Sequence, residues 1–304
     1  MTAKELLRKV RREVARDAAL QEKITRKYGG ANQGVSRQLV EAYLRDVVEA
    51  PILRGMDDRE QAIARGVLVA AVPMDTINAR AMRTDAGEFL VVLNERLMAL
   101  IHTWNELQIL SAVKGGEDGS LAQFARTFAP IMDCYLTPLS GKTLPVFDFD
   151  ELEPPYQMLA AVKTTLAEQF ILAHELAHIC LGHIGPAPEK SFARAAYWET
   201  YDAQNDMQQM EFDADAQAVQ WLLAGGEAAG GRLLLAVEVL ALLHFIECNT
   251  GFPPKQASHP SAIARLRNLR ERFGSDVFGA EGYSIDAMLK NMEDVEGFRI
   301  TAEG

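Results

Sequence analysis

The stretch QFILAHELAHICLGHIGP, residues 169–186, contains three of the six histidines of the chain within an otherwise apolar run. Apolar runs seldom include histidine and glutamate unless these side chains hold a ligand or pair with other polar groups. The residues in question are His174, Glu175, His178 and His183. Whether they bind a metal or are polar residues of the core decides both the fold and the function.

The segment HELAH, residues 174–178, has the spacing H-E-x-x-H. On an α-helix, side chains four residues apart lie about 40° apart around the axis, so His174 and His178 can bind the same ion. Glu175 lies beside that face, where it could hold a water bound to the metal. Zinc lowers the pKa of such a water to about 7, and the glutamate can take its proton and later pass it to the leaving amine. The spacing therefore predicts a catalytic zinc site.

Catalytic zinc sites usually have three protein ligands, so a third ligand is needed. His183 lies nine residues after His174, about 180° around the axis of an unbroken helix, and is predicted to point away from the metal. The metzincin pattern is excluded, because it needs glycine at 181 and histidine at 184, where this chain has Leu181 and Ile184.

The segment MEFDADAQAVQWLL, residues 210–223, offers a better third ligand. Glu211 and Asp215 are four residues apart on one helix face, among apolar neighbours. Glu211 is expected to complete a His2Glu zinc site, and Asp215 is expected to accept the distal N–H of a ligand histidine. Asp213 falls on the opposite side and is interpreted as surface charge. The alternative for the whole segment is a solvated acidic face.

A further candidate is His259, in the segment SHPSAIARLRNL, residues 258–269. Ser258 or Ser261 can cap the helix that follows, and Pro260 suits a helix start. His259 would then lie in a loop at a helix N-terminus, where in a hydrolase it could stabilise the oxyanion of a tetrahedral intermediate. An exposed loop histidine without a catalytic role is the alternative.

Other histidines and tyrosines are weaker candidates. His102 and His244 lie in apolar helical segments and are interpreted as core residues. Tyr197 and Tyr201 could also supply an oxyanion donor, but nothing in the sequence distinguishes them.

Hydrophobic periodicity predicts an α+β fold with a small mixed sheet, a mainly helical remainder and an active-site helix. The first sixty residues read as an N-terminal helical segment, and residues 61–304 as a second domain. Residues 114–155, rich in glycine and proline, form an insert or lid. Strands are predicted at 66–73, 75–83 and 89–94, with a turn at 84–88, and helices at 95–113, 155–186, 207–224, 231–249 and 261–273.

Composition and charge limit the function classes. The chain has 304 residues, of which 48% are hydrophobic and 24% charged, as in ordinary globular proteins with a sizeable core. Its formal net charge of −11 disfavours general binding to nucleic acid or anionic lipid. Residues 1–28 nevertheless carry nine Lys and Arg against four Asp and Glu, so this segment could contact an acidic partner. A solvated helix face is the alternative.

The expected location is cytoplasmic and away from membranes. The N-terminal segment is highly charged and resembles neither a secretory signal nor a transit peptide. The most apolar segment, residues 233–248, contains Glu238, His244 and Glu247 and is too short to span a membrane. The three cysteines are too few for a disulfide scaffold.

The combination of H-E-x-x-H with E-x-x-x-D on another helix resembles the gluzincin clan of zinc peptidases. The segments HELAHICLGH, EFDADAQA and SHPSAIAR resemble three branches. CAAX-type and heat-shock-type endopeptidases share HExxHxxxxH, an E-x-x-A-D helix and His-Pro followed by arginine, here Arg265. ImmA/IrrE regulatory proteases share LAHELAH and an E-x-x-A helix ending in paired leucines. Lit-type phage-exclusion peptidases are soluble, bacterial and of about this length.

The sequence also departs from two of these branches. No transmembrane helices flank the motif, and the gap of 33 residues from His178 to Glu211 is short for the CAAX type. A helix-turn-helix, as in the IrrE-type regulators, is not evident. The resemblance covers roughly residues 87–270. It implies a zincin-like catalytic domain within 61–304, with zinc on His174, His178 and Glu211 and with Glu175 as the base.

The resemblance implies a zinc endopeptidase that cleaves specific cytosolic protein targets, in stress or phage defence. In this clan an edge strand above the zinc helix pairs with the substrate backbone, although the sequence does not indicate which strand does so here. Two alternatives stay open. One is a catalytically silent, protease-like binding module, against which the intact Glu175 argues. The other is a peptidase of short peptides, for which the sequence shows no motif.

Overall fold

The structure is a computed structural model, and it describes ten parts of the chain. These are residues 1–16, 37–72, 78–114, 128–129, 131–132, 152–185, 204–225, 229–250, 260–274 and 289–290. His259, Tyr197, Tyr201 and most of the 114–155 insert lie outside the described residues.

The three predicted strands form one mixed sheet. Strand β1 (Val67–Val72) pairs in parallel with β3 (Phe89–Asn94), and β2 (Arg80–Arg83) pairs antiparallel with the other edge of β3. The predicted turn at 84–88 joins β2 to β3, with the Thr84 N–H donating to the Glu88 carbonyl over 2.8 Å. Gly87 has a φ of +80° in this turn, a conformation that glycine adopts without strain.

Helices make up most of the remaining described chain, so the predicted α+β class is confirmed. The helices are α1 (Ala3–Arg16), α3 (Arg37–Tyr43), the π-helix η1 (Leu44–Glu49), α4 (Ala50–Arg54), α5 (Asp58–Ala64), α6 (Glu95–Lys114), α8 (Pro154–Cys180), α9 (Gln204–Ala224), α10 (Ala229–Thr250) and α11 (Ala262–Phe273).

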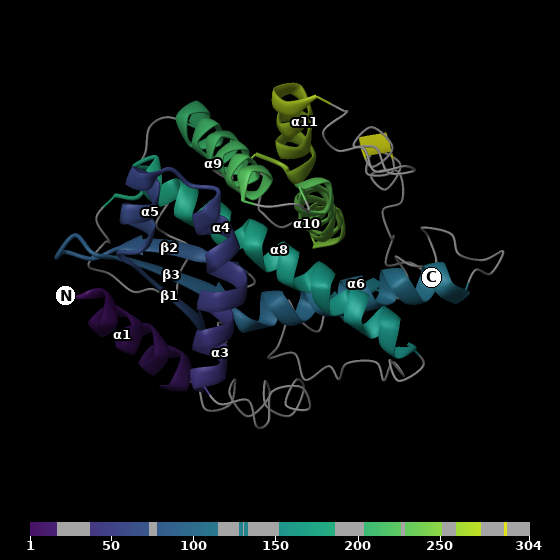
Figure 1. The fold of residues 1–304 in the computed structure, drawn as a ribbon, viewed down its shortest axis with the longest axis horizontal. Helices are drawn as coiled ribbons and strands as arrows, with labels where there is room; N and C mark the ends of the chain where they lie inside the picture. The colour runs from purple at the N-terminus through teal and green to yellow at the C-terminus, as the bar shows by residue number, and fades with distance from the viewer. Residues whose placement is uncertain are drawn as a thin grey trace.

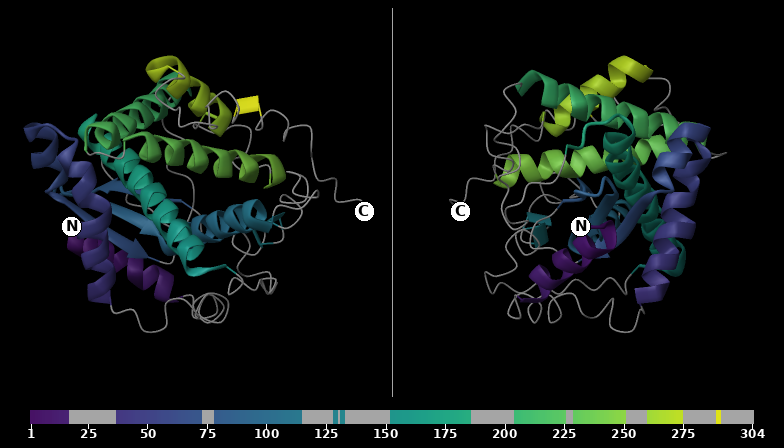
Figure 2. Two further views of the ribbon diagram at one scale, coloured as in Figure 1. Left: turned by 45° about the vertical axis from the view of Figure 1, so that its right-hand side comes forward. Right: turned by 90° about the vertical axis from the view of Figure 1, so that its left-hand side faces the viewer.

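Helices cover both faces of the sheet (Figures 1 and 2). Helix α1 packs Leu6, Leu7 and Val10 on one face, against a cluster that includes Leu90 and Val92. The other face contributes apolar side chains to the main core, which also contains residues of η1, α4, α8, α9 and α10. Because successive side chains of a strand point to opposite faces, β3, which is apolar except for Asn94, is buried on both sides.

Helix α8 runs through the centre of the helical layer and contacts α6, α9 and α10 (Figure 2). Helix α9 comes very close to α4, where a side chain on Gly55 would overlap the Trp221 carbonyl oxygen. The Trp221 indole N–H also donates to the Glu60 carboxylate over 2.8 Å. These contacts fix α9 against both α8 and the N-terminal helices.

The end of α8 differs from the sequence prediction, which extended this helix to Gly185 and Pro186. The helix ends at Cys180, and Gly182 takes a φ of +76°. The His183 N–H donates to the His178 carbonyl and the Gly182 N–H to the Ile179 carbonyl, which is the Schellman pattern of a helix C-terminus. The prediction of an unbroken helix was therefore wrong, because the glycine at this position ends it.

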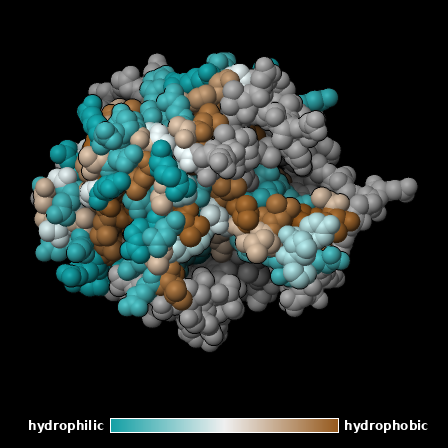
Figure 3. Space-filling model, viewed as in Figure 1, coloured by the Kyte–Doolittle hydropathy of each residue, from teal (hydrophilic) through white to brown (hydrophobic). Residues whose placement is uncertain are grey.

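The visible surface is mixed in character. Figure 3 shows hydrophilic residues over much of the described part of this face, with apolar patches between them. In the described chain, no helix combines the length and apolarity needed to cross a membrane.

One buried acid on α8 leads to a prediction about stability. Glu168 is 7% exposed and accepts a hydrogen bond from the Tyr43 hydroxyl. Burial raises the pKa of its carboxyl from 4.5 to about 7. Between these values the folded state binds more protons than the unfolded state, so stability falls as pH rises through this window.

We expect Glu168→Gln to remove this loss of stability and to keep the hydrogen bond from Tyr43. The free energy of unfolding of the variant should exceed that of the wild type by a small amount at pH 5 and by at most about 3 kcal/mol at pH 8. Urea unfolding at both pH values measures the gain. An equal difference between variant and wild type at pH 5 and pH 8 would contradict the prediction.

Candidate metal centre

Helices α8 and α9 bring two histidines and one glutamate together in the interior. The Nε2 atoms of His174 and His178 are 3.0 Å apart, and each lies 3.4 Å from a Glu211 carboxylate oxygen. All three residues are buried, with exposed fractions of 9%, 8% and 4%. These three side chains are the group of possible metal ligands found among the described residues.

The donor set fits a divalent transition metal. Two imidazoles and one carboxylate are the ligands of many catalytic zinc sites. In a tetrahedral site with metal–ligand distances of about 2.0–2.1 Å, neighbouring donor atoms lie about 3.3 Å apart. The observed separations of 3.0 Å and 3.4 Å bracket that value. The structure does not identify the metal.

Asp215 and Arg265 hold His174 in place. The His174 Nδ1 atom is 2.9 Å from the Asp215 carboxylate, so the predicted contact is present and Nε2 faces the centre. Arg265, from α11, binds both Asp215 oxygens, over 2.7 Å through Nε and 2.6 Å through Nη2. Its Nη1 lies 3.6 Å from Glu211. The resemblance to known peptidases pointed to Arg265 but did not indicate its role.

The charges of this cluster compensate one another. Burial alone would raise the pKa of the Asp215 carboxyl, but Arg265 and the hydrogen bond with His174 hold that pKa below its ordinary value. Burial opposes charge on His174, whereas Asp215 and Glu211 raise its pKa to about 9. Two carboxylates thus favour a cation at the His174 position, whether a proton or a metal.

The sequence prediction that His183 points away from the metal assumed an unbroken helix; the chain instead turns after α8, and His183 contacts His178 without being one of the three grouped donors. The turn at Gly182 brings the His183 Nδ1 atom to 3.0 Å from the His178 Nδ1 atom. Burial and the nearby His178 lower the pKa of His183 to about 4, so it is neutral at pH 7. A neutral His183 can accept a hydrogen bond from the His178 Nδ1–H, which leaves His178 Nε2 free to bind a metal. The glycine two residues after the helix end was the available signal.

Glu175 lies one residue after His174 on α8 and is half-buried. Within the described parts of the chain, its carboxylate has no hydrogen-bond or ion-pair partner. Each other acid of the cluster has a cationic or imidazole partner, whereas Glu175 is available to an external group.

The remaining candidate residues are placed as follows. Asp213 pairs with Arg272 over 2.6 Å at the surface, away from the cluster, as expected for surface charge. Ser261 caps α11, with its hydroxyl accepting from the Ala264 N–H, as predicted. His244 is buried, but the His102 side chain is 41% exposed and contacts Glu106, so the assignment of His102 to the core was wrong.

Comparison with protein families gives one finding for this part of the chain. Residues 143–279 match the family model described as Peptidase U49. The matched segment contains the His174, His178 and Glu211 group together with Glu175 and Arg265. No curated protein and no solved structure gave a match. The family match supports a hydrolase of the peptidase type, and the buried group could supply it with a metal ion.

Proposed function

We propose that the protein is a zinc-dependent endopeptidase that cleaves one or a few protein targets. The observation that supports this proposal best is the buried His174, His178 and Glu211 group, within a segment that matches a peptidase family, beside Glu175, which has no partner among the described residues. A protein that used this fold only for binding would have no need of the carboxylate at 175.

Each residue of the centre has a proposed role. His174, His178 and Glu211 hold the zinc, which when bound supplies Lewis acidity toward the scissile carbonyl and toward water. The Glu175 carboxylate accepts a proton from the attacking water and later transfers it to the amine that leaves. Asp215 fixes His174 with Nε2 toward the centre, and Arg265 keeps Asp215 ionised. His259, on which the structure is silent, stays a proposed donor to the oxyanion.

The setting of this activity is also proposed. A cytoplasmic location and a role in stress or phage defence rest on the resemblance to phage-exclusion peptidases. Inspection of the neighbouring genes tests the role. Defence genes beside this one would support it, and a housekeeping operon would contradict it.

The test of the activity is to map new protein N-termini in a cytosolic extract. We expect cuts in one or a few proteins with the zinc-loaded protein, and none with the chelator-treated protein or with Glu175→Gln. Cuts that persist in both controls would come from a contaminating protease. Absence of cuts with the loaded protein in extracts from stressed, phage-infected and untreated cells would contradict the proposal.

Metal removal has an expected effect on stability. A ligand that binds only the folded state adds about 4 kcal/mol at a concentration of 1,000 times its Kd. We expect zinc to raise the melting temperature and a chelator to lower it again. Glu211→Gln, which loses one charged ligand, should show a much smaller shift. Equal melting temperatures of the wild type with and without zinc would contradict the assignment of these residues as ligands.

A further inference from the structure

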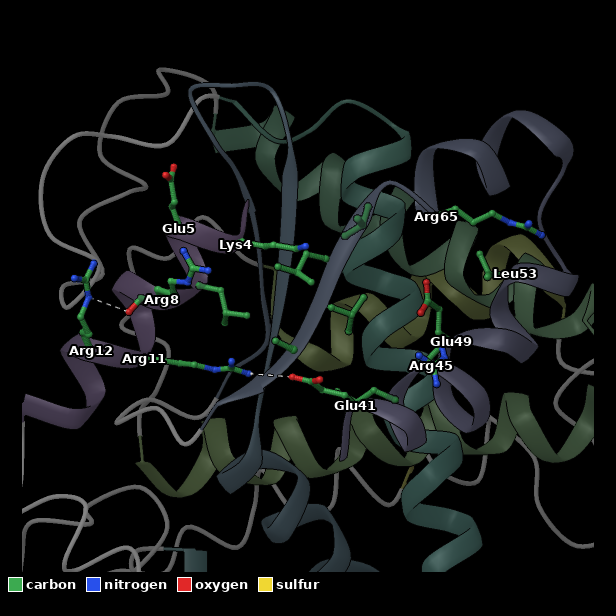
Figure 4. A pocket seen from close by; sticks show the side chains of 16 residues that line it. Lys4, Glu5, Arg8, Arg11, Arg12, Glu41, Arg45, Glu49, Leu53 and Arg65 are labelled. Atoms are coloured by element: carbon green, nitrogen blue, oxygen red, sulfur yellow. Dashed lines mark hydrogen bonds and ion pairs between the residues drawn. The ribbon is translucent and has the colours of Figure 1, made fainter. Parts of the chain in front are cut away.

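A groove of about 1200 Å³ lies between α1 and the layer formed by α3, η1 and α4 together with Arg65, the residue that follows α5, and has β1 at its floor. We call this the basic groove. Figure 4 shows Lys4, Arg8 and Arg11 on the α1 wall and Arg45 and Arg65 on the opposite wall. No residue of α8 or α9, the helices that carry the metal centre, lines it.

Cationic side chains outnumber acidic ones in the basic groove, six to three. The six are Lys4, Arg8, Arg11, Arg12, Arg45 and Arg65, and the three are Glu5, Glu41 and Glu49. Arg11 and Glu41 are 3.9 Å apart across the groove. The groove is therefore a positively charged region on a protein whose net charge is −11.

The positive charge on the α1 wall is ordered by the helix. Lys4, Arg8, Arg11 and Arg12 follow the spacing i, i+4, i+7 and i+8, which places them on one side of α1. The opposite side of α1 packs on the sheet through Leu6 and Val10. The helix thus presents a row of cations next to the strand.

The floor of the groove is an unpaired strand edge. Within the described chain, β1 pairs only with β3, so one edge of β1 keeps its backbone N–H and C=O groups free. Four consecutive residues, Val67 to Ala70, line the groove. Because their side chains alternate between the two faces of the sheet, a cavity that contacts all four meets the strand at its edge.

We propose that the basic groove binds an extended acidic peptide segment of a partner protein, which pairs with β1 as a fourth strand. The free strand edge supplies hydrogen bonds to the peptide backbone, and the cations on both walls select acidic side chains. A free strand edge matches the donor and acceptor spacing of an extended peptide backbone, which a nucleic acid does not have, so the geometry favours a peptide. The site is separate from the metal centre, and binding to it requires no hydrolysis.

The site is also separate from the sheet edge nearest the metal centre. The strand order places β2 at one edge and β1 at the other, and α8 packs against β2 and β3. In Figure 1, β2 lies toward α9 and β1 lies away from it. A segment docked on β1 would therefore tether a partner by a part other than the one that is cut.

The test uses a fluorescent peptide of about ten residues in which glutamate and threonine alternate. A strand presents its backbone N–H groups alternately to its two edges, so only one edge of the peptide contacts β1. N-methylation of every second residue blocks one edge, and methylation of the other set blocks the opposite edge. We expect one methylated peptide to lose binding and the other to retain it. Equal binding of the two would overturn strand pairing.

The charge requirement is tested on the full-length protein. We expect Arg8→Glu to weaken binding of the unmodified peptide by about tenfold, because it reverses an exposed charge on the groove wall. Arg59→Glu, an equal charge change on α5 outside the groove, should change the Kd by less than about twofold. Urea unfolding verifies that both variants fold.

Three further results would overturn the proposal. One is equal weakening by the two substitutions, which would indicate attraction by net charge alone. Another is that single-stranded RNA binds as tightly as the peptide and that Arg8→Glu weakens its binding by the same factor. This would indicate an unselective anion site. The third is a Kd for the peptide above about 1 mM.

Discussion

The Glu175→Gln variant is expected to lose peptidase activity and to keep its metal. Glutamine has nearly the same shape as glutamate but cannot accept a proton from the attacking water. General-base catalysis typically contributes about 10²–10⁴-fold to the rate, and we expect kcat/KM to fall by at least about 10³-fold. The variant should fold normally, since no described residue pairs with the Glu175 carboxylate.

The readout must separate catalysis from metal binding. Zinc affinity of the variant, measured by competition with a chromophoric chelator, should stay within about threefold of the wild type, because Glu175 is not one of the three grouped donors. Asp213→Asn is a matched control, since it also neutralises an acid near the motif helices but pairs only at the surface. Full activity of Glu175→Gln would show that Glu175 is not the base. Loss of zinc binding by the same variant would indicate that Glu175 is a metal ligand.

Much of the fold could be predicted because hydrophobic periodicity is local. The run FLVVLN predicted the central strand, and the apolar repeat at 95–113 predicted α6. The predicted ends of both elements lie within one residue of the observed ends. The sequence of the insert and of the loop with His259 has no hydrophobic periodicity, so no helix or strand could be predicted there.

The group of possible metal ligands could be predicted for a similar reason. Each of the two residue pairs lies within a single helix, so the spacing of His174 and His178, and of Glu211 and Asp215, indicates directly which side chains share a face. The pairing of the two helices then followed from the need for a third ligand.

Contacts that depend on chain reversal or on distant segments could not be predicted in this way. The position of His183 depends on one residue, Gly182, whose positive φ reverses the chain after α8. The pairing of Arg265 with Asp215 joins residues 50 positions apart on two helices. Similarly, the basic groove exists only because α1 packs on the sheet beside an unpaired strand.

The second large effect is expected from Arg265→Met. Arg265 and Asp215 are buried, with side-chain exposures of 12% and 0%, and their pairing is bidentate. Methionine keeps much of the volume but removes the guanidinium, which leaves His174 as the remaining partner of the Asp215 carboxylate. Removing one partner of a buried ion pair typically costs about 3–5 kcal/mol, which we expect as the loss in the free energy of unfolding. Zinc affinity should also fall, by about 10–100-fold, because Asp215, no longer fixed by Arg265, holds His174 less firmly.

The same helix provides the control for this prediction. Arg272, also on α11, pairs with Asp213 on α9 over 2.6 Å, but these side chains are 33% and 38% exposed. Arg272→Met should cost at most about 1 kcal/mol and leave zinc affinity unchanged. Adding Asp215→Asn to Arg265→Met removes the charge that Arg265 had compensated, so stability should partly recover while zinc affinity stays low. If zinc affinity recovered together with stability, Arg265 and Asp215 would be stabilising the fold without positioning His174.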